Sequence, residues 1–205
     1  MIDAAMVAAL FVVAGGAVAI AARNGHVVAL GLLLALAAAP LVASPLPEST
    51  AAAARILGAL LSAYLLWTVT RVGPVNSEGS AIGMAAEMAA AATAFAIGLQ
   101  ISPVDPLVGP RVAQAAGLAV LVLAVVPLAS RDIFRLGLGV ILLTVGSSLL
   151  LEAWVGSTPP LTQLALTGLL AGIAGATAIL IERPRTYDER TDGEGEVVAP
   201  AKGRA

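Results

Sequence analysis

The run AAMVAALFVVAGGAVAIAA, at residues 4–22, contains nineteen consecutive residues without a charge. A hydrocarbon core of about 30 Å needs about 20 apolar residues in one helix, so this run is long enough to cross a bilayer. Six more apolar runs follow before the chain turns polar at Glu182. The sequence therefore predicts an all-α, polytopic integral membrane protein with about seven transmembrane helices. We expect these spans near residues 4–22, 26–44, 52–70, 80–100, 111–129, 136–154 and 161–181.

The composition agrees with a membrane protein and argues against resident metals. Of 205 residues, 59% are hydrophobic and 12% are charged, with a mean hydropathy of +0.96; a soluble domain has about 25% charged residues. The chain has no cysteine, and His26 is its single histidine. Disulfides, thiolate-bound clusters and haem ligation by this chain are therefore disfavoured. We expect no cofactor and no metal site.

The first run has one alternative interpretation, a cleaved signal peptide. Asp3 is the only early charge, and no small-residue cleavage site follows before the second run. A signal peptide would instead begin with a basic segment. We therefore expect the first run to be a spanning helix.

Basic residues predict the orientation, because cytoplasmic loops of membrane proteins are rich in Lys and Arg. The opposite set of loops carries only Arg55 and Arg111. We therefore expect the N-terminus outside and the C-terminus in the cytoplasm, in a cytoplasmic (inner) membrane. Residues 1–182 would form the transmembrane domain and residues 183–205 a disordered cytoplasmic tail. The nine basic residues on the predicted cytoplasmic side are Arg23, Arg71, Arg131, Arg135, Arg183, Arg185, Arg190, Lys202 and Arg204.

A weak internal duplication is visible in the chain. Arg23 precedes Gly31 by eight residues, and Arg131 precedes Gly139 by the same spacing, each time at the start of a span. Both arginines belong to predicted cytoplasmic loops, so the two halves would run parallel, with one spacer helix between them. Chance similarity between Ala-, Leu- and Gly-rich helices is the alternative.

Glu87 is the first candidate functional residue. The predicted span at 80–100 places it about two turns inside the membrane, where an ionisable group costs a few kcal/mol and is a functional hypothesis by default. A proton carrier is the functional interpretation. The alternative is a helix that starts later and leaves Glu87 among the lipid headgroups.

Three hydroxyls in the predicted span at 136–154, those of Thr144, Ser147 and Ser148, are further proton-path candidates. Their alternative role is to bond back to carbonyls one turn earlier. Arg55, one turn into its span, can extend to the headgroups. No phosphate loop, nucleophile elbow or metal-ligand cluster is found, and nothing suggests nucleic-acid binding, so autonomous catalysis is not expected.

Residues 131–149, RDIFRLGLGVILLTVGSSL, carry two arginines four apart, a glycine four residues later and a Gly-Ser pair before a leucine. This pattern resembles a helix of the hydrogenase-4 component E family, a membrane subunit of hydrogenase-4 and formate hydrogenlyase-type complexes. It is more distantly similar to the K subunit (chain 4L) of respiratory complex I and to the C component of Mrp antiporters. The following run PLTQLALT, residues 160–167, resembles the next span of these families.

The resemblance implies a non-catalytic subunit of a cation-translocating redox complex. Its partners would be antiporter-like and hydrogenase- or dehydrogenase-type subunits, besides membrane lipids, and Arg131 and Arg135 would contact cytoplasmic neighbours or lipid. These families place a carboxylate in the helix after the double arginine, where this chain has Thr144 or Ile141. The resemblance thus implies a scaffold subunit, or proton conduction through Glu87 alone. A self-standing small-solute transporter and a purely structural membrane protein remain the alternatives.

Overall fold

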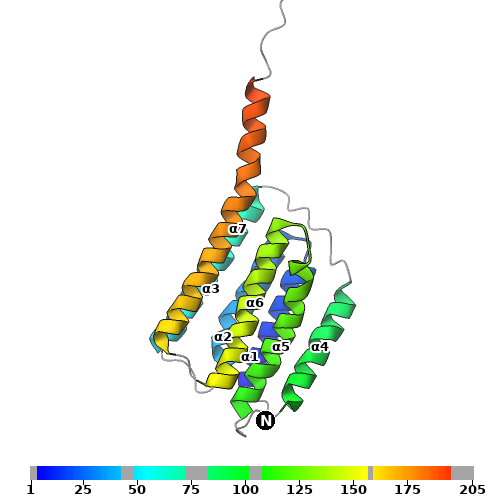
Figure 1. Ribbon diagram of the computed structural model, residues 1–205, viewed down its shortest axis with the longest axis vertical. Coiled ribbons are helices and arrows are strands. Elements are labelled where there is room, and N and C mark those ends of the chain that lie inside the picture. Colours follow the sequence, from blue (N-terminus) through cyan, green and yellow to red (C-terminus); the bar gives the residue numbers. More distant parts are fainter. Residues whose placement is uncertain (1–3, 43–48, 73–82, 102–107, 157–158, 195–205) are drawn as a thin grey trace, which may run out of the picture.

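Seven α-helices make up the part of the chain that the computed structural model describes, residues 4–42, 49–72, 83–101, 108–156 and 159–194 (Figure 1). Within those residues there is no strand, so the predicted all-α class is confirmed. The helices are α1 (Ala4–Ala21), α2 (Gly25–Val42), α3 (Ser49–Val72), α4 (Met84–Gln100), α5 (Val108–Leu128), α6 (Ile133–Val155) and α7 (Pro160–Glu194).

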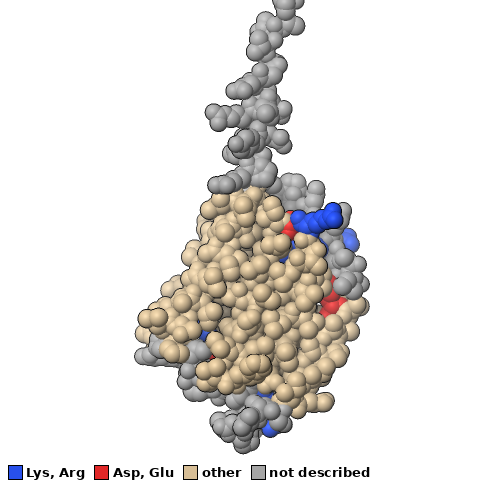
Figure 2. Space-filling view, viewed as in Figure 1, with Lys and Arg blue, Asp and Glu red and all other residues tan. Residues whose placement is uncertain are grey.

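Five of these helices, α1, α2, α5, α6 and α7, are long and apolar enough to cross a membrane. The apolar parts of α3 and α4 are shorter, at Ala52–Thr68 and Met84–Gln100. The face in Figure 2 consists almost entirely of uncharged side chains, and large apolar residues such as Leu30, Leu57 and Leu161 are more than half exposed. Such a surface is unfavourable in water and suits lipid. The protein is therefore membrane-embedded.

The helices alternate in direction and form three groups. The hairpins α1–α2 and α5–α6 make the inner bundle, with α1 packed against α5. The helix α3 packs along α7 at one side of this bundle and also touches α2, whereas α4 lies at the other side against α5 (Figure 1). Consequently α2, α4 and α6 end, and α3, α5 and α7 begin, at the lower end of Figure 1.

Glycines bring the backbones of each inner hairpin into contact. A Cβ atom added to Gly31 would lie 2.8 Å from the carbonyl oxygen of Gly15, and one added to Gly117 would lie 2.9 Å from that of Gly146. Real Cβ atoms essentially never approach other atoms so closely. Close backbone approach at small residues is the usual way in which membrane helices associate. The glycines of the inner bundle are thus required by its packing.

The two inner hairpins also share the turn that opens their second helix. The N–H of His26 donates to Asn24 Oδ1 (3.1 Å), and the N–H of Phe134 donates to Asp132 Oδ1 (3.1 Å). Each side chain satisfies one of the donors left free at a helix start. Gly31 then packs on the backbone of Ala19, and Gly139 on that of Leu128. The two hairpins share these features, and the internal duplication itself stays a prediction.

Two helix boundaries differ from expectation. The helix α4 begins at Met84 rather than near residue 80, since its N-cap residue Gly83 has a positive φ of 97°, which is not a helical conformation. The helix α7 continues to Glu194, where a disordered tail was expected from residue 183. Extending an existing helix avoids the cost of nucleation, so charged residues can follow an apolar helix without a break. Residues 195–205 lie outside the described part of the chain.

Candidate functional site

An ion pair inside the helix assembly joins Arg55 of α3 to Glu152 of α6. The Arg55 Nη2 atom donates to Glu152 Oε1, and the two side chains are only 11% and 6% exposed. Arg55 lies near the beginning of α3 and Glu152 near the end of α6, so both are at the lower end of the bundle in Figure 1. Charges in such surroundings are tolerated when they are paired and hydrogen-bonded.

The two side chains reach across a gap between their helices. Within the described residues, the backbones of α3 and α6 have no direct contact. The helix α3 packs against α2 and α7 instead, and α7 in turn packs against α6. A cavity of about 30 Å³ lies in this gap. Its lining comes from four helices: Leu36, Ala39 and Pro40 of α2; Arg55, Gly58 and Ala59 of α3; Val145 and Ser148 of α6; Leu166, Thr167 and Leu170 of α7.

Besides Arg55, the cavity lining contains two hydroxyl side chains, and the other side chains that line it are apolar. Ser148 Oγ bonds the carbonyl of Val145 (2.8 Å) and Thr167 Oγ1 that of Gln163 (2.9 Å), so each hydroxyl keeps accepting capacity. Pro40 has no N–H, and the helical bond to the carbonyl of Leu36 therefore cannot form. Both Leu36 and Pro40 line the cavity. The site thus combines one ion pair, two hydroxyls and a carbonyl without its helical donor.

The sequence alone did not reveal this site. Arg55 was expected to extend to lipid headgroups, but its pairing with Glu152 keeps it inside the bundle. Glu152 was not singled out, although it is an ionisable residue near the end of an apolar helix. Because successive spanning helices alternate in direction, the end of α6 and the beginning of α3 lie at the same end of the bundle. This alternation is the signal that would have placed Glu152 near Arg55. The pairing itself joins residues 97 positions apart and depends on tertiary structure.

The three predicted hydroxyls do not form one polar patch. Thr144 Oγ1 bonds the carbonyl of Val140 (2.8 Å), which is the back-bonding expected as the alternative. Ser147 is exposed on the outside of α6. Only Ser148 lines the cavity beside Arg55. Of the predicted proton-path hydroxyls, one therefore belongs to the candidate site.

Glu87 lies in the first turn of α4 and not two turns inside it. It is nevertheless buried, at 6% exposure, and its carboxylate is near the positive end of the helix dipole. Glu87 lines a groove of about 250 Å³ between α4 and α5, whose other lining residues are Ala86, Ala90, Val122, Leu123, Val125 and Val126. It lies at the opposite end of the bundle from Arg55 and Glu152, so the two carboxylates belong to separate sites.

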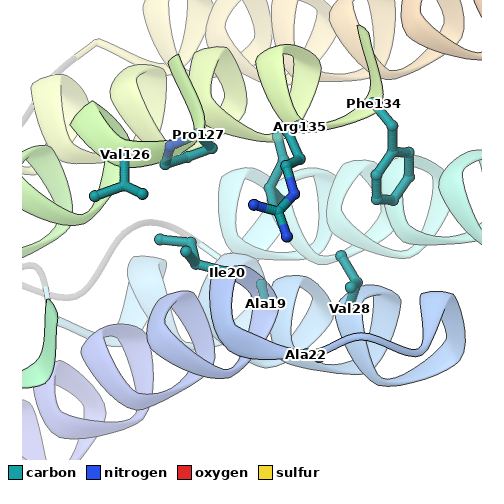
Figure 3. Close-up of a pocket in the computed structure, with 9 residues that line it drawn as sticks. Ala19, Ile20, Ala22, Val28, Val126, Pro127, Phe134 and Arg135 are labelled. Carbon is teal, nitrogen blue, oxygen red and sulfur yellow. The ribbon is translucent and has the colours of Figure 1, made fainter. Parts of the chain in front are cut away.

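The two arginines of the α5–α6 turn have different surroundings. Arg131 is exposed. Arg135 is half-buried, and in Figure 3 its guanidinium points from α6 toward α1 and α2, between Ile20 and Val28. The cavity there measures only about 10 Å³. Arg131 is thus accessible to a neighbour or to lipid, whereas Arg135 belongs to the interior of the helix junction.

Comparison with known proteins adds no relative. The chain matches no protein-family model, no curated protein and no solved structure. Among the described residues, no three His, Cys, Asp or Glu side chains come together in a metal-binding group.

Proposed function

We propose that this protein is a non-catalytic membrane subunit of a proton- or cation-translocating redox complex of the hydrogenase-4 or complex I kind. It would lie in the cytoplasmic (inner) membrane, with the C-terminal end of α7 in the cytoplasm. Antiporter-like subunits would pack beside it, and hydrogenase- or dehydrogenase-type subunits would carry the redox centres. The family resemblance of residues 131–149 and 160–167 suggests this complex, and the exposed face of α7 supports the role of a packing subunit.

The exposed face of α7 is the observation that carries the proposal. Only 11% of the most apolar 18-residue window of α7 is buried, against 44–61% of the corresponding windows in the other four long apolar helices. Gly168 and Gly172, four residues apart, both lie on the exposed side. No atom of another described residue lies within 4 Å of a Cβ added to either. Glycines at this spacing form close helix–helix interfaces in membranes, so this face suits a neighbouring transmembrane helix.

The candidate polar site fits this role better than it fits a transporter. A cavity of about 30 Å³ has room for roughly two water molecules, not for a solute. The larger groove between α4 and α5, at about 250 Å³, favours the alternative of a self-standing small-solute transporter. Its lining is apolar except for Glu87, however, and specific solute binding needs several placed polar groups.

Affinity purification of the tagged full-length protein in mild detergent, followed by mass spectrometry, tests the proposal. We expect antiporter-like subunits and a hydrogenase- or dehydrogenase-type subunit to co-purify. Gly168→Ile should reduce their recovery at least severalfold, because a branched side chain separates closely packed helices. Ala14→Ile is the matched control, since it adds a branched side chain to an exposed position of α1.

Two results would contradict the proposal. A chain recovered alone or as a homo-oligomer would favour the transporter or structural alternatives. Equal recovery of partners with Gly168→Ile and wild type would remove α7 as the packing face, even if a complex forms.

A further inference from the structure

The groove between α4 and α5 occupies one end of this helix pair, and a close backbone contact occupies the other. A Cβ atom added to Gly98 of α4 would lie 2.5 Å from the Cα atom of Ala115 of α5. About three turns away along both helices, Glu87 and Val126 line the groove of about 250 Å³. The two helices therefore touch at the lower end of Figure 1 and leave space between them at the upper end.

Small residues on α4 account for this space. Of the three buried residues of α4, Glu87, Ala91 and Gly98, only Glu87 has a large side chain. The other α4 residues that line the groove are Ala86 and Ala90, and those of α5 are aliphatic. Side chains of one methyl group do not fill the space between two helices. The groove thus has apolar walls and a single charged lining residue, the buried Glu87.

The groove is open to the surroundings of the bundle. Val122 and Val125 are 37% and 61% exposed, and Ala86 and Ala90 are exposed on the facing helix. In a membrane-embedded protein, hydrocarbon chains surround such an apolar surface. A cavity of about 150 Å³ already binds small apolar molecules, so this groove has room for part of an acyl chain. A neighbouring helix, about 10–12 Å across, is too wide to enter it.

The charge in the lining favours one class of lipid headgroup. Glu87 lies where α4 begins and α5 ends, and the end of a spanning bundle is the part nearest the headgroups. A carboxylate there attracts a cationic group and repels an anionic one. A primary ammonium also donates hydrogen bonds to a buried carboxylate, which a quaternary ammonium does not. Arg131, exposed in the turn after α5, adds a positive charge at the same end, which suits a lipid phosphate.

We propose that the groove between α4 and α5 binds one phospholipid with a primary ammonium headgroup, of the phosphatidylethanolamine type. Its acyl chain lies between the two helices, and its ammonium donates to the carboxylate of Glu87. One charged group is sufficient here, because the chain needs only apolar contacts and the carboxylate selects the headgroup.

This inference goes beyond the proposed function, because it concerns the isolated chain and needs no partner subunit. The helices α4 and α7 lie at opposite sides of the inner bundle, so a neighbour that packs on α7 leaves the groove open (Figure 1). The absence of partner subunits after affinity purification would therefore not affect it.

Native mass spectrometry of the delipidated full-length protein tests the headgroup preference without any mutation. Phosphatidylethanolamine competes for the protein with phosphatidylglycerol, which is anionic, or with phosphatidylcholine, whose ammonium has no N–H donor. All three lipids carry acyl chains of equal length. We expect the first bound lipid to be phosphatidylethanolamine, in severalfold excess over either competitor. Equal binding of phosphatidylethanolamine and either competitor would overturn the proposal.

Glu87→Gln tests the carboxylate in the same competition. The amide keeps the size of the side chain and removes its charge, so the attraction of an ammonium and the repulsion of an anionic headgroup are both lost. We expect the preference for phosphatidylethanolamine over phosphatidylglycerol to fall at least severalfold. A variant that keeps the wild-type preference would show that Glu87 does not select the headgroup.

A matched pair of variants tests the place of the acyl chain. Ala90→Phe fills the groove, whereas Ala92→Phe adds the same side chain to an exposed position of α4 that does not line it. Phosphatidylethanolamine with a photoreactive diazirine in its acyl chain should label peptides of α4 and α5 in the wild-type protein. We expect this labelling to fall severalfold with Ala90→Phe and to persist with Ala92→Phe. Equal labelling of the two variants, at a high or a low level, would show that the chain does not lie in this groove.

Discussion

Glycine serves opposite purposes in the inner bundle and on α7. In the α1–α2 and α5–α6 hairpins, glycines allow two backbones to touch, and an added Cβ atom at Gly31 would meet main-chain atoms of Gly15 and Ala19 at 2.7–2.8 Å. On α7, a Cβ atom added to Gly168 or Gly172 would meet no atom of another described residue within 4 Å. The comparison teaches that composition alone does not give the role of a small residue. A filled glycine contact is part of the fold, whereas an open one leaves a surface for a neighbour.

The two regions are also held differently. Backbone contacts hold the inner hairpins together, whereas the α3–α7 pair reaches α6 partly through the ion pair of Arg55 and Glu152. Three changes test this difference, beginning with the one for which we expect the largest effect.

Glu152→Ala should have the largest effect on stability. Removing one partner of a buried ion pair leaves an uncompensated charge and costs about 3–5 kcal/mol. The free energy of unfolding can be measured in mixed SDS micelles by the fluorescence of Trp67 and Trp154. The double variant Arg55→Met with Glu152→Leu should recover most of the loss, because neither charge then remains buried. A loss below about 1 kcal/mol would mean that the pair is solvated as surface pairs are.

Gly31→Ala should have an intermediate effect. The new methyl group would lie 2.7 Å from the backbone nitrogen of Ala19, and two backbones must separate to admit it. Overpacking of this kind costs about 1–3 kcal/mol. Gly168→Ala is the matched control, for which we expect a change within about 0.5 kcal/mol in the isolated protein. Equal losses for the two variants would remove the distinction between filled and open glycines.

Gly58→Ala should have the smallest of the three effects. Its new Cβ atom would meet the side chain of Thr167 on α7, not a backbone. A side chain can change rotamer, so we expect a loss near the lower end of the roughly 1–3 kcal/mol range for overpacking, in the same unfolding measurement. Adding Thr167→Ser removes the methyl group in the way and should restore part of the loss. A larger loss than for Gly31→Ala would show that α3 and α7 pack as rigidly as the inner hairpins.

The sequence predicted the local features well, because hydrophobic runs report directly on helices that contact lipid. The run at 4–22 corresponds to α1 and that at 26–44 to α2, within two residues at each end. The position of Glu87 within its helix differs from the prediction, since a polar segment before α4 does not indicate where its first helical bond forms; its depth in the membrane stays a prediction. The partner of Arg55 was missed for a different reason. Glu152 is 97 positions away in the sequence and lies beside it only in the packed bundle, and no local pattern reports that contact.

The length of α7 has a mechanical consequence. Its 35 residues make a rod of about 52 Å, of which roughly 20 Å follow Ile181 and extend past the other helices (Figure 1). Along that rod, Thr167 packs on Gly58 and lines the cavity beside Arg55. A protein that binds the projecting end and rotates it would apply torque to the half of the same helix that packs along α3. Because the helix is continuous, a displacement of its projecting end would reach the packing around the Arg55–Glu152 pair.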